Sequence, residues 1–338
     1  MCTDLRLVRL PLHISARTLD FAFELGSRVQ VVPRGQAWTA TATNGAVAPL
    51  TWTNSLGFVG MDAFDFDQFF ADGLNEAGLS VGTLWLPETT LPDTPPQSGS
   101  LPALDFINLA GWLLGTCSTV ADVKKALGEV QIWNAPVKAL WPAGQAVPPK
   151  LQPMMEWAFT EHLAIHDASG ADLVVEFLDG EAQLHDNAVG VLTNSPAYPW
   201  HVTNLRNYIG LTNVDPKPYN LMGMPILKTG NGTGLMGLPG DVTPPSRFVR
   251  ATVLSQVFTS AAGPREAVNQ AFHSLDLVSV PRDLAASGDY TQWYVVRDHD
   301  SRVYYVRSYE GWTTDAHDLA ALGVDRRGAT SSVPLPGV

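Results

Sequence analysis

The sequence predicts an α+β fold in which helices and antiparallel sheets are stacked in layers. Strand-like runs come in blocks joined by short turns, and segments with helix start signals lie between these blocks. The chain has 338 residues, of which 45% are hydrophobic and only 16% are charged, which is ample for a large core. We therefore expect one domain over residues 1–338, with a loop excursion rich in Gly, Pro and Asn around residues 200–242.

The first strands are expected at residues 5–10 and 12–23, which flank a proline suited to a tight turn. A hairpin about this turn would place Cys2 opposite the neighbourhood of Asp20 and Phe21. The remaining strands are expected to form antiparallel blocks, one of them closed by a strong Asp-Gly hairpin signal. They are predicted over residues 79–86, 157–166, 171–178, 181–185, 189–193, 290–297 and 302–309.

Helices are predicted where apolar periodicity follows a capping residue or a proline. Thr119 with Asp122 three residues later is a capping-box pattern, and Thr243 precedes two prolines. The predicted helices span residues 66–76, 103–115, 120–130, 243–259 and 264–275.

Composition excludes several classes of function. A net charge of −12 and a pI near 5.0 argue against a nucleic-acid partner, because phosphate binding needs clustered Lys and Arg. The longest apolar stretches, such as residues 106–114, fall short of the roughly 20 residues of a bilayer span. No export signal is visible, so a cytoplasmic location is expected, with export of a chain lacking its signal peptide as the alternative. Two cysteines form neither a zinc ribbon nor a disulfide framework, and Cys117 is expected to be a buried spectator.

The strongest chemical signal is Cys2, because removal of Met1 would leave cysteine as the amino terminus. One residue would then carry a sulfur nucleophile and a free α-amine. A peptide α-amine titrates near about 7.7–8.0 and a thiol near about 8.5, so the amine can accept the thiol's proton near neutral pH. An N-terminal residue that supplies its own base is a known way to activate a nucleophile.

Four further polar residues are candidates for this chemistry, each with a structural alternative. Arg17 could favour the thiolate or be a surface charge. Asp20 lies in an apolar run, where a nearby ammonium would remove the cost of burying it, but regular alternation points Arg17 and Asp20 to opposite faces. Asn194 could donate to an oxyanion or cap a turn, and Arg247 could order the site or face solvent.

Other familiar patterns lack the required context. Residues 232–237 spell GxGxxG, but neither a preceding strand nor a following helix is predicted. His162 and His166 lie in a strand-like segment without HExxH, and we expect them in the core or on the surface rather than on a metal.

Several ordered segments together resemble the choloylglycine hydrolase family, which includes conjugated bile-salt hydrolases and penicillin V acylases. The resemblance extends from residue 2 to about residue 310. It rests on Met1-Cys2-Thr3, Arg17-Thr18-Leu19-Asp20, Asp72-Gly73-Leu74-Asn75-Glu76, Leu192-Thr193-Asn194-Ser195-Pro196, Gly237-Leu238-Pro239-Gly240-Asp241 and Pro245-Ser246-Arg247-Phe248.

The resemblance implies a four-layer αββα sandwich of two antiparallel sheets flanked by helices, the N-terminal nucleophile (Ntn) hydrolase fold. It also implies catalytic roles for five residues. Cys2 would be nucleophile and base, Arg17 would poise the sulfur, Asp20 would hold the amine, Asn194 would donate to the oxyanion, and Arg247 would order the site.

Where bile-salt hydrolases carry a second asparagine, this chain has Trp85. An aromatic ring there is more similar to penicillin V acylases, because it can line a pocket for a phenoxyacetyl or fatty acyl group. Leu19, Phe21 and Phe23 are expected to complete the acyl pocket. Residues 204–239 have the length of the family's assembly loop, so a homotetramer is expected.

The expected reaction is acyl transfer through a thioester, with a small-molecule N-acyl amide as substrate and without a metal or organic cofactor. Penicillin V, N-acyl homoserine lactones and conjugated bile salts compete as substrates. A catalytically silent protein of the same fold that binds acyl ligands is the alternative of another class.

Overall fold

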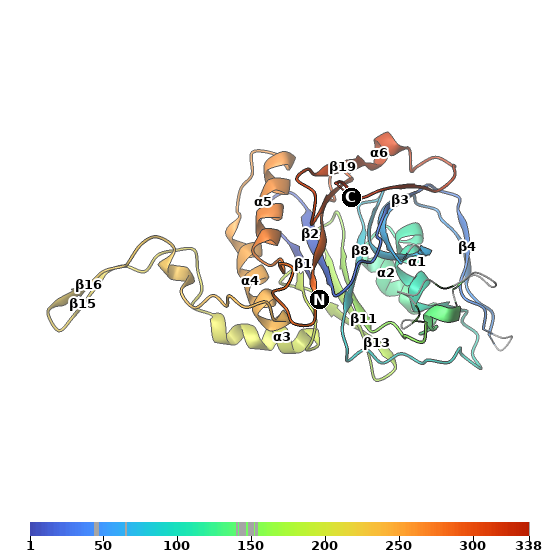
Figure 1. The fold of residues 1–338 in the computed structure, drawn as a ribbon, viewed down its shortest axis with the longest axis horizontal. Coiled ribbons are helices and arrows are strands. Elements are labelled where there is room, and N and C mark those ends of the chain that lie inside the picture. Colours follow the sequence, from blue (N-terminus) through green and yellow to red (C-terminus); the bar gives the residue numbers. More distant parts are fainter. Residues whose placement is uncertain are drawn as a thin grey trace.

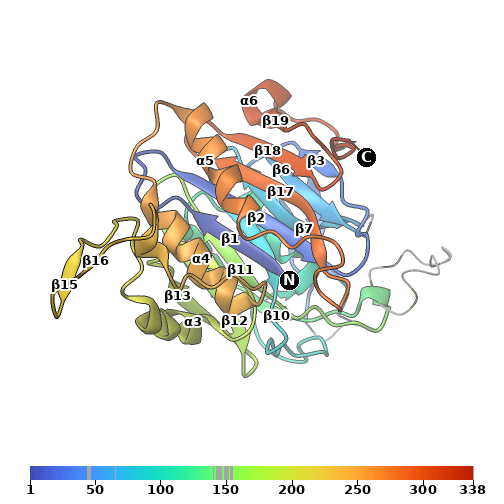
Figure 2. The same ribbon diagram turned by 60° about the vertical axis from the view of Figure 1, so that its left-hand side comes forward.

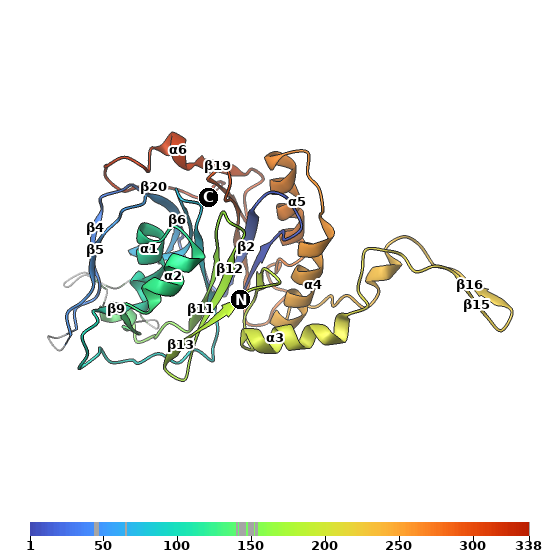
Figure 3. The ribbon, with the colours of Figure 1, turned by 180° about the vertical axis from the view of Figure 1, so that it is seen from behind.

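The computed structural model describes residues 1–43, 47–64, 66–139, 141, 147, 152 and 155–337. Two large antiparallel sheets lie face to face, and helices cover both outer faces (Figures 1 and 3). Helices α4 (Pro244–Val257) and α5 (Pro264–Asp276) pack on one sheet, and α1 (Phe106–Thr116) packs on the other. The four-layer αββα arrangement implied by the resemblance is confirmed.

The smaller sheet has six strands in the order β14-β1-β2-β17-β18-β19, with every neighbour antiparallel. The predicted first hairpin forms, but its first strand spans Cys2–Arg6 instead of residues 5–10, and Cys2 pairs with Leu19 instead of lying opposite Asp20 and Phe21. Strand β1 pairs with β2 along its whole length and with β14 at Asp4 and Leu5, so the main-chain pairing of Cys2 is with Leu19. The strands are β1 (Cys2–Arg6), β2 (Ile14–Phe21), β14 (Val191–Leu192), β17 (Tyr290–Asp298), β18 (Val303–Ser308) and β19 (Asp315–Asp318).

The larger sheet has eight strands in the order β13-β12-β11-β8-β7-β6-β3-β20. Its central strands are buried on both faces, between the other sheet and α1. The strands are β3 (Val29–Val32), β6 (Phe58–Ala63), β7 (Phe66–Asn75), β8 (Ser80–Trp85), β11 (Glu161–His166), β12 (Asp172–Leu178), β13 (Glu181–Asp186) and β20 (Ser331–Val333).

Shorter elements complete the fold. The capping box predicted at Thr119 is confirmed at the start of α2 (Val120–Leu127). Two-stranded sheets pair β4 (Ala37–Thr39) with β5 (Thr51–Thr53) and β9 (Ala103–Asp105) with β10 (Gln131–Trp133). The remaining helices are α3 (Tyr198–Asn204) and α6 (Leu319–Leu322), and short 3₁₀ turns span Val137–Ala139, Leu205–Tyr208 and Thr233–Leu235.

The helix predicted over residues 66–76 is wrong, because this segment is β7, hydrogen-bonded to β6 and β8. A central strand covered on both faces lacks clean alternation, and here Phe66, Phe69 and Phe70 recur at the i, i+3, i+4 spacing of a helix. Gly73 shows how closely α1 packs on this strand, since a Cβ there would lie 2.5 Å from Leu114.

Other predicted boundaries also move. The helix expected over residues 120–130 ends at Leu127. The helix expected from residue 103 begins at Phe106, because Asp105 accepts a hydrogen bond from the Asn108 backbone and caps it. The strand expected from residue 157 begins at Glu161.

The predicted loop excursion leaves the body of the molecule as a long arm (Figures 1 and 2). Its tip is a small hairpin of β15 (Tyr219–Leu221) and β16 (Met224–Ile226). Apolar side chains along the arm are strongly exposed, including Ile209, Met222 and Met236. Among the described residues, no helix has both the length and the apolar character needed to cross a membrane.

Candidate active site

Strand alternation places the candidate residues on two faces of the smaller sheet. Cys2 and Arg17 lie on the face toward the larger sheet, because Cys2 pairs with Leu19, two residues beyond Arg17. Asp20 lies on the other face, near Arg247 of α4. Strand β2 therefore alternates regularly. A β-bulge lies instead in the neighbouring strand β17, between Thr291 and Trp293.

The sulfur of Cys2 faces a buried guanidinium. Arg17 Nη2 lies 3.6 Å from Cys2 Sγ, and Arg17 is fully buried. Its guanidinium also donates to the carbonyls of Ala71 and Thr83, and it lies 3.2 Å from the Asp72 carboxylate. Burial lowers the pKa of Arg17, but the negative charges of Cys2 and Asp72 more than offset this, so its pKa is raised. Arg17 therefore remains a cation beside the nucleophile.

Asn194 and Arg247 hold the backbone of Cys2. The Cys2 nitrogen donates to Asn194 Oδ1 at 2.8 Å, and Arg247 Nη2 donates to the same oxygen at 2.8 Å. Arg247 Nη1 also donates to the Cys2 carbonyl and, at 2.6 Å, to the Thr3 hydroxyl. Asn194 Nδ2 donates to the Trp85 carbonyl at 2.7 Å, which leaves one amide hydrogen for another acceptor.

Asp20 keeps one carboxylate oxygen without a hydrogen-bond partner. Its Oδ1 accepts from the Thr291 hydroxyl at 2.6 Å, whereas the buried Oδ2 has no hydrogen bond and lies 3.9 Å from Arg247. Burial raises the pKa of Asp20. The Met1 ammonium donates to the Asp20 carbonyl at 2.6 Å and lies 3.2 Å from Asp289, so in this state no amine reaches the Asp20 carboxylate.

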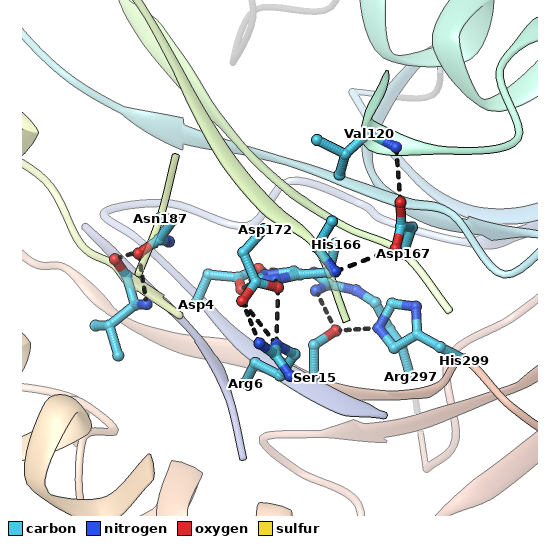
Figure 4. A network of polar contacts seen from close by, with 12 residues as sticks. Asp4, Arg6, Ser15, Val120, His166, Asp167, Asp172, Asn187, Arg297 and His299 are labelled. Carbon is cyan, nitrogen blue, oxygen red and sulfur yellow. Dashed lines mark hydrogen bonds and ion pairs between the residues drawn. The ribbon is translucent and has the colours of Figure 1, made fainter. Parts of the chain in front are cut away.

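A chain of alternating charges links Cys2 to the far end of the layer between the sheets. Figure 4 shows its outer part, in which the His166 ring lies between two carboxylates at 2.7 Å each. Burial lowers the pKa of His166, but these carboxylates outweigh it and raise the pKa to about 9. Taken in order, the members are Arg6, Asp172, His166, Asp4, Arg297, Asp72, Arg17 and Cys2.

The arginine at the centre of this chain is fully enclosed. Arg297 Nη2 lies 2.9 Å from Asp4, and its Nε donates to Asp72 at 3.0 Å. Tyr304 donates to Asp72 at 2.9 Å. Because each charge has neighbours of opposite sign, the layer can bury them without leaving one unpaired.

An apolar cavity of about 580 Å³ opens beside the nucleophile. Leu19, Phe21, Phe23 and Trp85, the four residues expected to bind substrate, all line it together with Cys2 and Arg17. The structure also places in its wall several residues that sequence reasoning missed: Phe64, Phe69, Trp157, Phe159, Glu161 and Asp289. Phe69 lies in the segment predicted as a helix. The available signal was that Phe69 and Ala71 are two residues apart, which places both side chains on the same face of a strand.

His162 and His166 are both core residues, one of the two outcomes expected for them. His162 contacts Glu176 and the Thr193 carbonyl, each at 3.1 Å. Within the part of the chain that the structure describes, no cluster of three or more His, Cys, Asp or Glu is arranged to hold a metal ion.

Two facing antiparallel sheets between helical layers, with a cysteine at the start of an inner strand, define an Ntn-hydrolase fold. The model of the linear amide C–N hydrolases, choloylglycine hydrolase family, matches residues 2–331, and the chain belongs to this family. It is accordingly an enzyme that acts on linear amide C–N bonds.

Its relatives include enzymes of both kinds named by the resemblance. A bile salt hydrolase/transferase of Clostridium perfringens is 29% identical over 333 residues, which cover 96% of this chain and 94% of the relative. A penicillin V acylase of Pectobacterium atrosepticum is 25% identical over 343 residues, covering 94% of this chain and 80% of the relative.

Solved structures agree with this assignment. A variant of conjugated bile acid hydrolase from Clostridium perfringens superposes with a TM-score of 0.81 at 27% identity, covering 99% of this chain and 98% of that one. Penicillin V acylase from Agrobacterium tumefaciens shares the fold with a TM-score of 0.76 at 24% identity, covering 99% of this chain and 91% of that one.

Proposed function

We propose that this protein hydrolyses linear amides between an apolar acyl group and an amine, in the manner of a penicillin V acylase. One observation carries the proposal: the Cys2 sulfur, held 3.6 Å from a buried guanidinium, lines an apolar cavity of about 580 Å³. A cavity of that size takes a small acyl group, and a thiolate at its wall reaches the carbonyl.

The reaction begins with loss of Met1, which converts the Cys2 nitrogen from an amide into an amine. That ammonium would find Asn194 Oδ1 as an acceptor, with the unpartnered Oδ2 of Asp20 as a further candidate. The free amine takes the thiol proton and the thiolate attacks the amide carbonyl. The Cys2 ammonium then protonates the leaving amine, which leaves a thioester on Cys2.

Water then releases the acid. The Cys2 amine accepts a proton from the water as it attacks the thioester, and the thiolate leaves toward Arg17. In both steps the spare Nδ2 hydrogen of Asn194, together with a backbone N–H, stabilises the oxyanion.

The lining of the cavity supports an apolar acyl group and disfavours conjugated bile salts. Its acidic residues are Glu156, Glu161 and Asp289, against one arginine that is already paired. An anionic glycine or taurine group leaving from Cys2 past Glu156 or Asp289 would be repelled by these carboxylates. The Trp85 ring, which is 41% exposed, offers a flat surface for an aromatic or alkyl chain.

The test is turnover by Cys2→Ser, measured as released amine, with Cys117→Ser as the matched control. We expect Cys2→Ser to lose nearly all activity while its circular dichroism spectrum is unchanged, because a hydroxyl is far less ionised than a thiol. Cys117→Ser should keep activity, since its sulfur lies outside the cavity. Normal turnover by Cys2→Ser would refute the mechanism.

A substrate panel separates the finer alternatives. Penicillin V, an N-acyl homoserine lactone and glycocholate are compared by kcat/KM, and glycocholate is expected to be poorest. If glycocholate is turned over fastest, a bile-salt hydrolase is the better assignment. If none is turned over and Cys2 resists alkylation after loss of Met1, the protein is a silent acyl-binding member of the fold.

The exposed arm supports self-assembly, and we propose that the enzyme is a homotetramer. Met222 is fully exposed and Ile209 and Met236 are exposed by 89% and 74%, a concentration of apolar surface that monomers rarely present. Sedimentation velocity tests this: a monomer at micromolar concentration would contradict it.

A further inference from the structure

Glu161 is a titratable residue in the acyl cavity that the hydrolytic mechanism does not use. It is the first residue of β11 and pairs with Trp85 on β8. Alternation puts its side chain on the face of the sheet shared by Trp85 and Thr83, whereas His162 points toward the other sheet. Glu161, Trp85 and Thr83 all line the cavity that also holds Cys2.

The carboxyl group of Glu161 is incompletely partnered. Among the described residues, no Lys, Arg or His lies within ion-pair distance of it, in contrast to the carboxylates of the charge chain. The Thr83 hydroxyl lies near the carboxyl group but donates to the Ala71 carbonyl at 3.4 Å, and Oε2 is shielded from solvent and has no hydrogen-bond partner. Glu161 as a whole is only half-buried and lines the cavity, so its carboxyl group can meet a ligand there, and a polar group held away from water without a partner costs free energy that such a ligand would recover.

The surroundings favour the acid form of this group. Burial raises the pKa of Glu161, and the Thr83 hydroxyl and the charges of Arg17, His162 and the N-terminal ammonium offset this only in part. A protonated carboxyl carries one O–H donor, which the apolar wall of Phe69 and Phe159 does not satisfy.

Glu161 lies close to the reacting end of the cavity. Arg17 Nη2 contacts Cys2 Sγ and also donates to the carbonyl of Thr83, the residue whose hydroxyl contacts Glu161. A group bound by Glu161 therefore belongs to the first atoms of the acyl chain beyond the carbonyl.

We infer that Glu161 is a specificity-determining residue that donates a hydrogen bond to an ether, keto or hydroxyl oxygen near the start of the acyl chain. The inference rests on the proposed function and narrows its substrate class. Phenoxyacetyl and 3-oxoacyl amides fit, whereas plain alkanoyl amides of the same length leave the donor unsatisfied.

The experiment compares two amides of 7-amino-4-methylcoumarin that differ by one atom, phenoxyacetyl and 3-phenylpropanoyl. The preference for the oxygen-bearing substrate in kcat/KM should be about tenfold larger in the parent than in Glu161→Leu, because the inductive effect of the ether oxygen on the carbonyl is the same in both. Glu161→Gln retains an N–H donor and should keep part of the preference. If Glu161 were purely structural, its replacement would change kcat/KM for both substrates by the same factor.

The pH dependence of this ratio adds a second readout. The preference should fall at alkaline pH in the parent enzyme, because the ionised carboxylate has no hydrogen to donate. In Glu161→Gln the ratio should not vary with pH. Glu181→Leu, an exposed acid on the same sheet and outside this cavity, is the matched control and should keep the parent ratio. An unchanged ratio in Glu161→Leu overturns the inference.

A binding measurement tests the role of Glu161 independently of whether the protein hydrolyses these amides. Calorimetric titration of Cys2→Ala with the N-methylamides of the two acids needs no turnover. Tighter binding of the phenoxyacetyl amide, lost in Cys2→Ala with Glu161→Leu, supports the role of Glu161 even if the parent protein hydrolyses neither substrate. Equal binding of the two amides, or binding of neither, overturns it.

Discussion

Replacing Asp72 with Asn should destabilise the protein strongly, because this carboxylate serves two buried arginines at once. Its two oxygens face four donors: Arg17 Nη1 at 3.2 Å, Arg297 Nε at 3.0 Å, Arg297 Nη2, and the Tyr304 hydroxyl at 2.9 Å. Asn keeps one acceptor oxygen, and its amide group would face donors instead.

The magnitude follows from these contacts. About two of the four donors lose their acceptor, and each buried unsatisfied donor costs about 1–3 kcal/mol. Breaking a buried ion pair by removing one partner costs about 3–5 kcal/mol. Since Arg297 keeps Asp4 and Arg17 keeps two carbonyls, we expect a loss of about 3 kcal/mol in the free energy of unfolding.

Urea denaturation followed by tryptophan fluorescence measures this loss. Asp276→Asn is the matched control, because Asp276 pairs with Arg307 but is 46% exposed, and exposed pairs contribute about 0–1 kcal/mol. A loss below about 1 kcal/mol for Asp72→Asn would show that the alternating charges do not stabilise one another as described.

Three further outcomes are expected. The pKa of His166 is raised to about 9, above its unfolded value of about 6.5, so its contribution to stability is complete below about pH 6.5 and is lost as the pH rises through about 9. Denaturation midpoints across this window should fall by less in His166→Gln than in the parent, and parallel curves would contradict the assignment. Arg17→Gln should slow alkylation of Cys2 by iodoacetamide at pH 7 about tenfold, because an adjacent cation favours the thiolate, and an unchanged rate would exclude that role. Gly82→Ala should lose about 1–3 kcal/mol in urea denaturation, since its Cβ would meet Asp72, Arg17 and Arg297 at 3.1–3.2 Å, whereas Gly210→Ala, with open space around it, should change little.

Much of the fold could be predicted from local signals. The first hairpin follows from its turn, α2 from its capping box, and α4 and α5 from their prolines. The failure at β7 has a physical cause, because a strand covered on both faces carries no alternation to distinguish it from a helix.

The candidate site could be predicted only in part. Cys2 was found from its chemistry, and the four polar residues assigned with it lie around it in the structure. The charge chain could not be predicted, because Asp4 and Arg297 are 293 residues apart and nothing local marks them as partners. Glu161 was missed for a related reason: only the pairing of β8 with β11 brings it beside Trp85.

The pairing of β1 with β2 has a practical consequence for anyone handling this protein. Because Cys2 pairs with Leu19 on β2 and the Met1 carbonyl accepts from the Asp20 N–H, whatever precedes Cys2 must lie where Met1 does, at the wall of the acyl cavity. An affinity tag fused ahead of Cys2 would therefore obstruct the entrance as well as block the amine. Purification handles belong at the carboxyl end, beyond Gly337, which is exposed and does not line that cavity.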